Sequence, residues 1–195
     1  MLASGEGGRL RPASGAAGAQ PAGVDRPAPV DRLPARRREA GDAGGAVWWL
    51  GDHGGAGEST LEELFRGSRA AGHAWPLGGS DADRPRVVLV ARTNARGLRW
   101  TQNAICDCAG AGLAVRVLGL VLIADAPGRL PRALRDLAAL IAGGVPRVWW
   151  LSWVEAWRAG QAPTPANSPK EVRGLLGDLR AITSTGPDQP ERGVV

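Results

Sequence analysis

The feature of this sequence that most restricts its fold is a series of short, continuous apolar runs separated by helical patterns. The clearest runs are AVWWL at 46–50, RVVLVA at 86–91, VRVLGLVLIA at 115–124 and RVWWLS at 147–152. A run that is apolar at every position is typical of a strand buried on both faces. Such strands, alternating with amphipathic helices, predict a three-layer α/β fold: a mostly parallel sheet of about five strands with helices on both faces.

Between these runs the apolar residues recur at helical spacing. The first of these segments begins with two overlapping capping boxes, Ser59 with Glu62 and Thr60 with Glu63, which predict its N-terminus. A short strand, HAWPL at 73–77, is expected to end at Pro76. The segments expected to be helical are 59–72, 95–110 and 130–141.

Composition divides the chain into a core and flanking segments. Residues 1–45 are rich in Ala, Gly, Pro and Arg and lack periodicity, so we expect a disordered tail. The α/β domain is expected at 46–160, followed by a Pro-rich linker at 161–167. A C-terminal helix is predicted at 168–183, with Ser168 as N-cap and Pro169 at its first position. Residues 184–195 are expected to be disordered.

The charge balance does not point to a dedicated nucleic-acid arm. The chain has 24 Lys and Arg against 19 Asp and Glu, a net charge of +5, and its single lysine is Lys170. The arginines are spread along the chain without a concentrated block, which favours a mildly basic, solvated surface. The longest apolar stretch, 117–126, is too short for a membrane span, and we expect a cytoplasmic protein without a secretory signal. Cys106 and Cys108 are expected to be reduced thiols.

The segment GDHGGAGEST at 51–60 lies between the first predicted strand and the first predicted helix, the context that a phosphate-binding loop requires. Within it, HGGAGEST resembles the deviant Walker A motif of the ParA/MinD type ATPases, K-G-G-x-G-K-[ST]-[ST]. The positions that match are Gly54, Gly55, Gly57, Ser59 and Thr60. Both lysines of the motif are replaced, by His53 and by Glu58.

This resemblance implies a reduced P-loop NTPase-like domain with ATP and Mg²⁺ as candidate cofactors, and Ser59 as the candidate magnesium ligand. The strand at 115–124 resembles the one that precedes the family's base-recognition residue, which places Asp125 near the base. The family's aspartate after its second strand and its D-x-x-x-G switch have no counterpart. The whole core, from 48 to 157, also resembles an uncharacterised actinobacterial domain family often found near mobile elements, which has no activity to carry over.

Glu58 stands at the most consequential position of the loop. A P-loop lysine neutralises phosphate oxygens, whereas a carboxylate repels them by about 4 kcal/mol at about 4 Å with an effective dielectric near 20. The glycine backbone and the helix dipole contribute only about 1 to 2 kcal/mol of attraction. We therefore expect weak or no nucleotide binding unless Glu58 turns away and an arginine supplies the charge.

Candidates for that arginine follow from sheet geometry, because ligands of open parallel sheets lie at the carboxyl ends of the strands. We call this edge the rim. Arg92 is the best replacement for the lysine, while Asp52, Glu58 and Asp125 make the rim acidic. The residues expected on the rim beside the loop are Arg92, Thr93, Asn94, Asp125, Ser152 and Trp153.

Three functional hypotheses follow. The first is a degenerate ParA/MinD-like domain, a non-hydrolysing pseudo-ATPase or partner-binding protein. The second is an active nucleotide-binding ATPase in which Arg92 replaces the lysine. The third is a DNA-associated accessory protein of a mobile element, suggested by Arg36, Arg37 and Arg38. A purely structural turn without ligand is the competing interpretation of the loop. A protein partner and a homodimer are expected, and the tryptophans are expected to fill the core.

Overall fold

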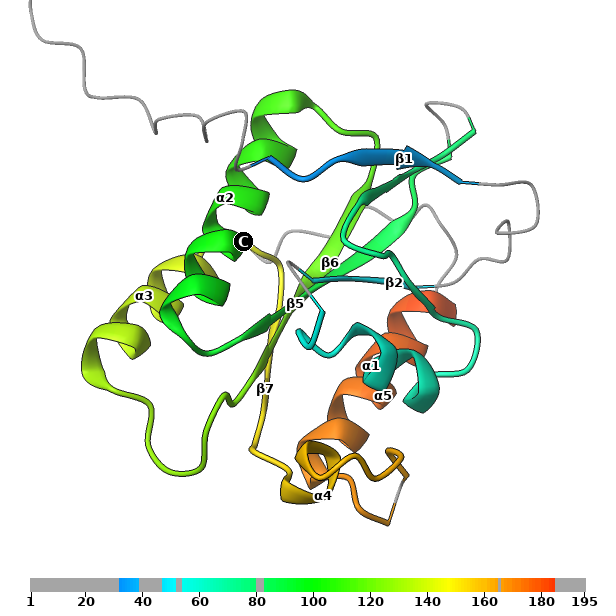
Figure 1. The fold of residues 1–195 in the computed structure, drawn as a ribbon. Helices are drawn as coiled ribbons and strands as arrows, with labels where there is room; N and C mark the ends of the chain where they lie inside the picture. The colour runs from blue at the N-terminus through cyan, green and yellow to red at the C-terminus, as the bar shows by residue number, and fades with distance from the viewer. Residues whose placement is uncertain (1–31, 39–46, 52–53, 80–82, 165, 185–195) are drawn as a thin grey trace, which may run out of the picture.

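The structure, a computed structural model, describes residues 32–38, 47–51, 54–79, 83–164 and 166–184. Within them, five strands form one parallel sheet in the order β3-β2-β5-β6-β7, and β1 and β4 form a separate two-stranded parallel sheet (Figure 1). The elements are β1 (Ala35–Arg37), β2 (Val47–Gly51), α1 (Glu58–Leu64), β3 (Arg69–Ala70), β4 (Trp75–Leu77), β5 (Arg86–Arg92), α2 (Ala95–Ala111), β6 (Arg116–Ile123), α3 (Arg132–Ala142), β7 (Val148–Leu151), α4 (Glu155–Arg158) and α5 (Lys170–Ser184).

The predicted three-layer α/β architecture is confirmed. Helices α1 and α5 cover one face of the main sheet, and α2 and α3 cover the other (Figure 1). The interior strands β2 and β5 are buried along nearly their whole length, which explains why their sequences are apolar without alternation. Their register is continuous from Val47↔Arg86 to Gly51↔Val90, so the carboxyl ends of both strands reach the same rim.

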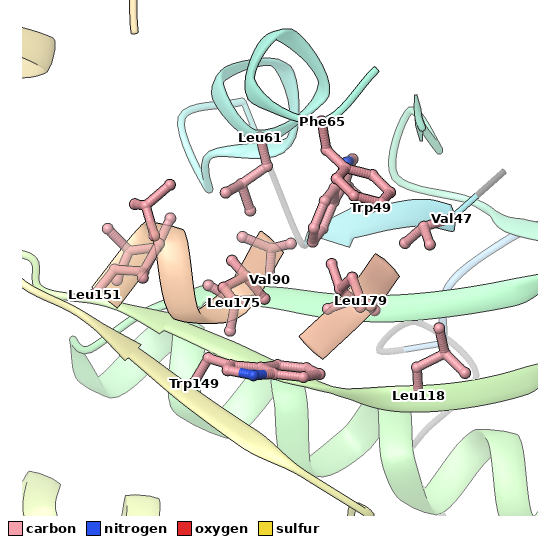
Figure 2. Close-up of a cluster of buried hydrophobic side chains, with 14 residues drawn as sticks. Val47, Trp49, Leu61, Phe65, Val90, Leu118, Trp149, Leu151, Leu175 and Leu179 are labelled. Atoms are coloured by element: carbon pink, nitrogen blue, oxygen red, sulfur yellow. The ribbon is translucent and has the colours of Figure 1, made fainter. Parts of the chain in front are cut away.

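The first hydrophobic core lies between the sheet, α1 and α5 (Figure 2). Trp49 packs edge-on against Phe65, with ring centroids 6.3 Å apart and an interplanar angle of 84°. The Trp49 indole Nε1 donates to Ser68 Oγ at 2.7 Å, and that hydroxyl donates to the Phe65 carbonyl at 2.7 Å. The indole is therefore buried without an unsatisfied donor, and the segment after α1 is fixed to the sheet.

The second core lies on the opposite face, between the sheet and helices α2 and α3. Leu98 and Ala104 of α2 and Ile141 of α3 are buried there. The prediction that the tryptophans fill the core is confirmed for both members of the first pair, but Trp150 of the second pair is 46% exposed. Trp150 lies on β7, an edge strand of the sheet, so one side of its ring has no neighbouring strand to cover it.

The first predicted helix is shorter than expected. We predicted a helix over 59–72, but α1 ends at Leu64, and Arg69–Ala70 form the edge strand β3. The helix ends because its C-cap residue, Phe65, is extended, with φ −118° and ψ 94°. Gly67 then has φ +85°, a left-handed conformation in the turn that leads to β3 beside β2. The predicted capping boxes are also wrong, because Gly57 is the N-cap residue and no side chain caps the helix.

Part of the segment expected to be disordered has regular structure. Residues 32–38 are described and include β1, which pairs with β4. The rest of the predicted tail and the C-terminal residues 185–195 lie outside the described residues. Pro76 does not end β4 as expected, since ladder bonds to the β1 segment are made by its two neighbours: Trp75 N donates to Pro34 O, and Leu77 O accepts from Arg38 N.

The remaining helices agree closely with the predicted segments, but the predicted start of the C-terminal helix is wrong: α5 begins at Lys170, and the Ser168 hydroxyl donates to Thr164 O instead of capping the helix. Asn94 caps α2 through its side chain, which accepts from Gly97 N at 2.8 Å. The predicted C-terminal helix corresponds to α5, which packs into the first core through Val172, Leu175 and Leu179 rather than standing apart from the α/β domain. No helix within the described ranges is both long enough and apolar enough to cross a membrane.

Candidate functional site

The strand order locates the site. From β2 the chain first adds β3 on one side and then crosses to the other side to add β5, β6 and β7 in turn. Such a reversal opens a crevice between the carboxyl ends of the two strands that flank it, here β2 and β5. The glycine loop follows β2, and Arg92 ends β5 at the same rim. The topology therefore brings together the two features that the sequence analysis singled out.

The loop has the backbone that its glycines suggest. Gly55 and Gly57 have φ of +94° and +117°, values that residues with side chains rarely adopt. A Cβ at Gly57 would lie 2.5 Å from Cδ1 of Ile123, so the loop packs directly against the end of β6. Asp52 and His53 lie outside the described residues, and the predicted role of His53 is not addressed by the structure.

The Glu58 carboxylate faces the protein interior. Its Oε1 accepts a hydrogen bond from Gly51 N at 2.5 Å, and its Oε2 lies 3.6 Å from His73 Nδ1. The same His73 nitrogen is 3.2 Å from Gly51 O. Glu58 therefore joins the end of β2, the start of α1 and the turn before β4, and only 6% of the residue is exposed.

Burial raises the pKa of Glu58 above its ordinary value of 4.5 because the charged form loses hydration. The hydrogen bond from Gly51, the charge of His73 and the backbone of His73 and Gly72 oppose this rise in pKa. His73 is the one described non-glycine residue with positive φ, +60°, and it follows Gly72 at +62°. The turn thus presents backbone groups to the carboxylate, which acts as an internal anion.

Arg92 lies at the end of β5, on the rim beside the glycine loop. Its Nε donates to Gly55 O at 3.0 Å and its NH1 donates to Ala124 O at 3.2 Å, so the guanidinium links the glycine loop to the end of β6. Burial lowers the pKa of Arg92, and the nearby Asp125 carboxylate opposes this. An arginine remains cationic under these conditions, and a guanidinium has five N–H donors, so donors remain for a ligand.

These residues surround a cavity of about 300 Å³ that we call the loop pocket. It brings together seven of the ten candidate site residues, whereas Glu58 and Ser59 do not line it. Trp157 and Arg158, on the short helix α4 that follows β7, were not among the candidate site residues. Their position directly behind the last predicted strand was the signal in the sequence. The lining consists of Gly54, Gly55, Gly57, Thr60, Arg92, Ile123, Asp125, Trp153, Val154, Trp157 and Arg158.

A second cavity of about 460 Å³, which we call the apolar pocket, adjoins the first and shares Asp125 with it. Its position is fixed by the loop from β6 to α3, where Thr93 Oγ1 accepts from Asp125 N at 3.2 Å. Ser152 donates to Glu171 at 3.3 Å at its margin. The lining consists of Thr93, Asn94, Ala124, Asp125, Ala126, Pro127, Gly128, Arg129, Leu130, Pro131, Leu134, Trp150, Leu151, Ser152 and Glu171.

The candidate magnesium ligand Ser59 is exposed and does not line the loop pocket. The next residue, Thr60, does line the pocket and also carries a hydroxyl group. Among the residues that the structure describes, no group of three or more His, Cys, Asp or Glu side chains could hold a metal ion. Cys106 and Cys108 are free, half-buried thiols on α2.

Comparison with known proteins adds one assignment. A family model described as "Family of unknown function (DUF6668)" matches residues 45–176, from just before β2 into α5. No curated protein and no solved structure matches the chain. No P-loop or ParA/MinD family model matches, and the ParA/MinD resemblance stays a prediction. The protein partner, the homodimer and the DNA association also stay predictions. Because the match covers about two thirds of the chain, the protein belongs to the DUF6668 family of unknown function.

Proposed function

We propose that this protein binds the phosphate groups of a nucleotide in the loop pocket without hydrolysing them, and that Arg92 replaces the lysine of a P-loop. The observation that carries the proposal is the placement of two charged groups: the acidic residue at the P-loop lysine position does not line the pocket, and an arginine from another strand does. The Glu58 carboxylate is bonded to Gly51 N, away from the pocket, while the Arg92 guanidinium lies between Gly55 O and Ala124 O on the pocket wall.

This arrangement changes the electrostatic expectation for the loop. The repulsion expected from Glu58 assumed that its carboxylate faces the phosphate, as the P-loop lysine does. The described lining of the loop pocket contains two cationic side chains, Arg92 and Arg158, and one carboxylate, Asp125. The pocket therefore has a positive balance, which favours an anion, and Arg92 can present its planar fork to phosphate oxygens.

The apolar pocket supports a nucleotide rather than a simple phosphate ion. It lies next to the loop pocket and is lined largely by apolar side chains, with the exposed Trp150 among them. A flat, uncharged ring can occupy such a cavity while a phosphate group attached to it reaches the adjoining cationic one. Asp125 lies at the junction, where its carboxylate can accept hydrogen bonds from a sugar or a base.

Turnover is not expected from this geometry. Phosphoryl transfer depends on several positioned charges and on a group that orients the attacking nucleophile. Glu58 is turned away from the pocket, so it cannot take that role, and Ser59 lies outside the pocket lining. The two arginines can hold phosphate oxygens in the ground state, which gives binding without assembling the transition state.

Isothermal titration calorimetry on the full chain tests the proposal with Mg-ATP, Mg-ADP and pyrophosphate. Arg92→Ala should weaken binding by at least about tenfold, since hydrogen bonds to a charged group contribute about 1.5–3 kcal/mol. Arg158→Ala should weaken binding by a smaller factor, because this exposed side chain is more strongly hydrated. A phosphate-release assay should detect no turnover.

The matched control is Arg135→Ala, which removes an exposed arginine on α3 that lines neither the loop pocket nor the apolar pocket. Because Arg92 also links two backbone carbonyls, thermal unfolding of each variant separates loss of binding from loss of fold. The proposal fails if the wild type releases no heat with any of the three ligands at millimolar concentration. It also fails if both pocket variants, correctly folded, bind like the control.

A further inference from the structure

A third cavity, of about 280 Å³, lies away from the rim, and we call it the arginine groove. It is placed by two strand registers, since the pair Arg36↔Pro76 joins β1 to β4 and the pair Trp48↔Arg69 joins β2 to β3. All four of these residues line the groove. The groove therefore lies between the two-stranded sheet and the edge of the main sheet, and it shares no lining residue with the loop pocket.

The groove has a strongly unbalanced charge. Among the described residues, its lining has four arginines, Arg36, Arg37, Arg38 and Arg69, and one carboxylate, that of Glu62 from α1. Two of the arginines have partners: Arg38 forms an ion pair with Asp83, and Arg37 NH1 donates to Gly79 O at 3.1 Å. Neither Arg36 nor Arg69 has an ion pair or a side-chain hydrogen bond within the described part of the chain.

The guanidinium groups of Arg36 and Arg69 carry like charges and repel each other across the groove. They stay there because β1 and β3, the strands that carry them, are held by backbone pairing with β4 and β2. An anion between them would remove that repulsion. Trp48, only 7% exposed, and Pro76 form apolar parts of the wall, while Arg36 and Arg69 are themselves exposed and accessible to an anion. Guanidinium groups fit phosphate oxygens with paired hydrogen bonds, and two of them fit a doubly charged group.

We propose that the arginine groove is a second anion-binding site, which seats a phosphate group between Arg36 and Arg69. Its volume is at the lower limit of small-molecule pockets, so it accommodates a phosphate with a sugar or a similarly small body rather than a complete dinucleotide. The phosphate belongs either to a small phosphorylated molecule or to one unit of a nucleic-acid strand that passes along the groove. Glu62 opposes anion binding and limits its strength.

The tryptophans allow the two sites to be observed separately. Trp48 lines the arginine groove, whereas Trp153 and Trp157 line the loop pocket. We therefore propose to record the indole N–H signals of the ¹⁵N-labelled full chain by NMR, assigned with Trp→Phe variants, during a titration with pyrophosphate. The Trp48 signal should shift in a saturable way, and Arg92→Ala should leave that shift intact while moving the shifts of Trp153 and Trp157 to pyrophosphate concentrations at least about tenfold higher.

Charge variants then identify the residues that bind. Arg36→Ala and Arg69→Ala should each weaken the Trp48 response by about tenfold, whereas Arg116→Ala, an exposed arginine at the start of β6, should have no effect. Glu62→Gln should strengthen binding by about threefold, because it removes the one negative charge from the wall. Strengthening by a single substitution is a result that misfolding cannot produce.

Ligand variants identify the source of the phosphate. Ribose 5-phosphate binding without ribose binding indicates a small phosphorylated molecule, and a short single-stranded oligonucleotide that binds equally with and without a terminal phosphate indicates the backbone of a nucleic acid. Either result supports the site. The proposal is overturned if the Trp48 signal does not respond to millimolar pyrophosphate, if it responds equally in the Arg36→Ala/Arg69→Ala double variant, or if a glutamate-rich peptide binds while no phosphate compound does.

Discussion

The loop pocket and the apolar pocket lie side by side on one rim and share Asp125, yet they differ in almost every other property. Glycine backbone, Thr60, two arginines and two tryptophans surround the first, whereas alanine, proline and leucine side chains with Trp150 dominate the second. The end of β6 separates them: Ile123 lines the loop pocket and Ala124 lines the apolar one. Because successive strand residues point to opposite faces, one strand end creates two environments, one suited to charge and one to an uncharged ring.

The largest expected effect concerns the rigidity of the loop pocket. Gly57→Ala should lower the free energy of unfolding by about 2 kcal/mol, because the residue has φ +117° and its Cβ would meet Ile123 at 2.5 Å. It should also abolish pyrophosphate binding at the loop pocket, while the indole N–H signal of Trp150 in the apolar pocket stays unchanged. Chemical denaturation measures the loss of stability, and the indole N–H signals of Trp153 and Trp157 in a pyrophosphate titration measure the loss of binding.

Gly54→Ala is the matched control for this prediction. A Cβ at Gly54 has no atom within 4 Å, and its φ is not positive, so the substitution should change stability by less than about 0.5 kcal/mol. Equal destabilisation by both substitutions would contradict the view that the contact between Gly57 and β6 shapes the loop pocket.

A smaller effect separates the two pockets by ligand. Trp150→Ala should weaken Mg-ADP binding by about fivefold, since a ring stacked on an aromatic side chain contributes about 1 kcal/mol, but it should leave pyrophosphate binding unchanged. Arg92→Ala should weaken both. The comparison of the two ligands in these two variants therefore assigns each part of a nucleotide to one pocket.

Leu140→Ala provides the control for loss of an exposed apolar side chain, because Leu140 on α3 is 68% exposed and lines neither pocket. If Trp150→Ala weakens pyrophosphate and Mg-ADP binding equally, the apolar pocket does not hold the ring, and the division of the rim into two environments has no functional meaning.

Much of the fold follows from local patterns in the sequence. The apolar runs predicted β2, β5 and β6, because an interior parallel strand must be apolar on both faces. The edge strand β7 was predicted from a similar run, although Trp150 in it is exposed. Strands β1 and β3 could not be predicted in this way. ARR and RA are too short and too polar to have a period, and they are strands only because β4 and β2 lie beside them.

In the candidate site, too, the features that depend on local sequence could be predicted, and those that depend on tertiary contacts could not. The rim rule for parallel sheets was sufficient to choose Arg92, because it depends only on which residue follows a strand. The direction of the Glu58 carboxylate depends on His73 and Gly51, and their approach requires the completed turn between β3 and β4. The identity of a residue in a motif therefore did not determine its role, because its partner is distant in sequence.

The smallest expected effect tests the direction in which the Glu58 carboxylate points. Burial raises the pKa of Glu58 in the folded protein, so the folded state holds this proton more tightly than the unfolded chain does. The corresponding stability is complete below about pH 4.5 and is lost as the pH rises through the raised pKa. Glu58→Gln keeps an oxygen acceptor for Gly51 N but cannot ionise. Its free energy of unfolding should therefore depend less on pH over this range, by about 1 kcal/mol or less.

Denaturant unfolding at a series of pH values measures this difference, with Glu63→Gln on the exposed face of α1 as the control. The same variant also reports on the loop pocket. Because the carboxylate faces Gly51 and His73, Glu58→Gln should leave pyrophosphate affinity within about twofold of the wild type. A gain of tenfold or more would place the negative charge in the pocket after all. Arg92 would then compensate for Glu58 at close range, and the difference between the two pockets would rest on Arg158 alone.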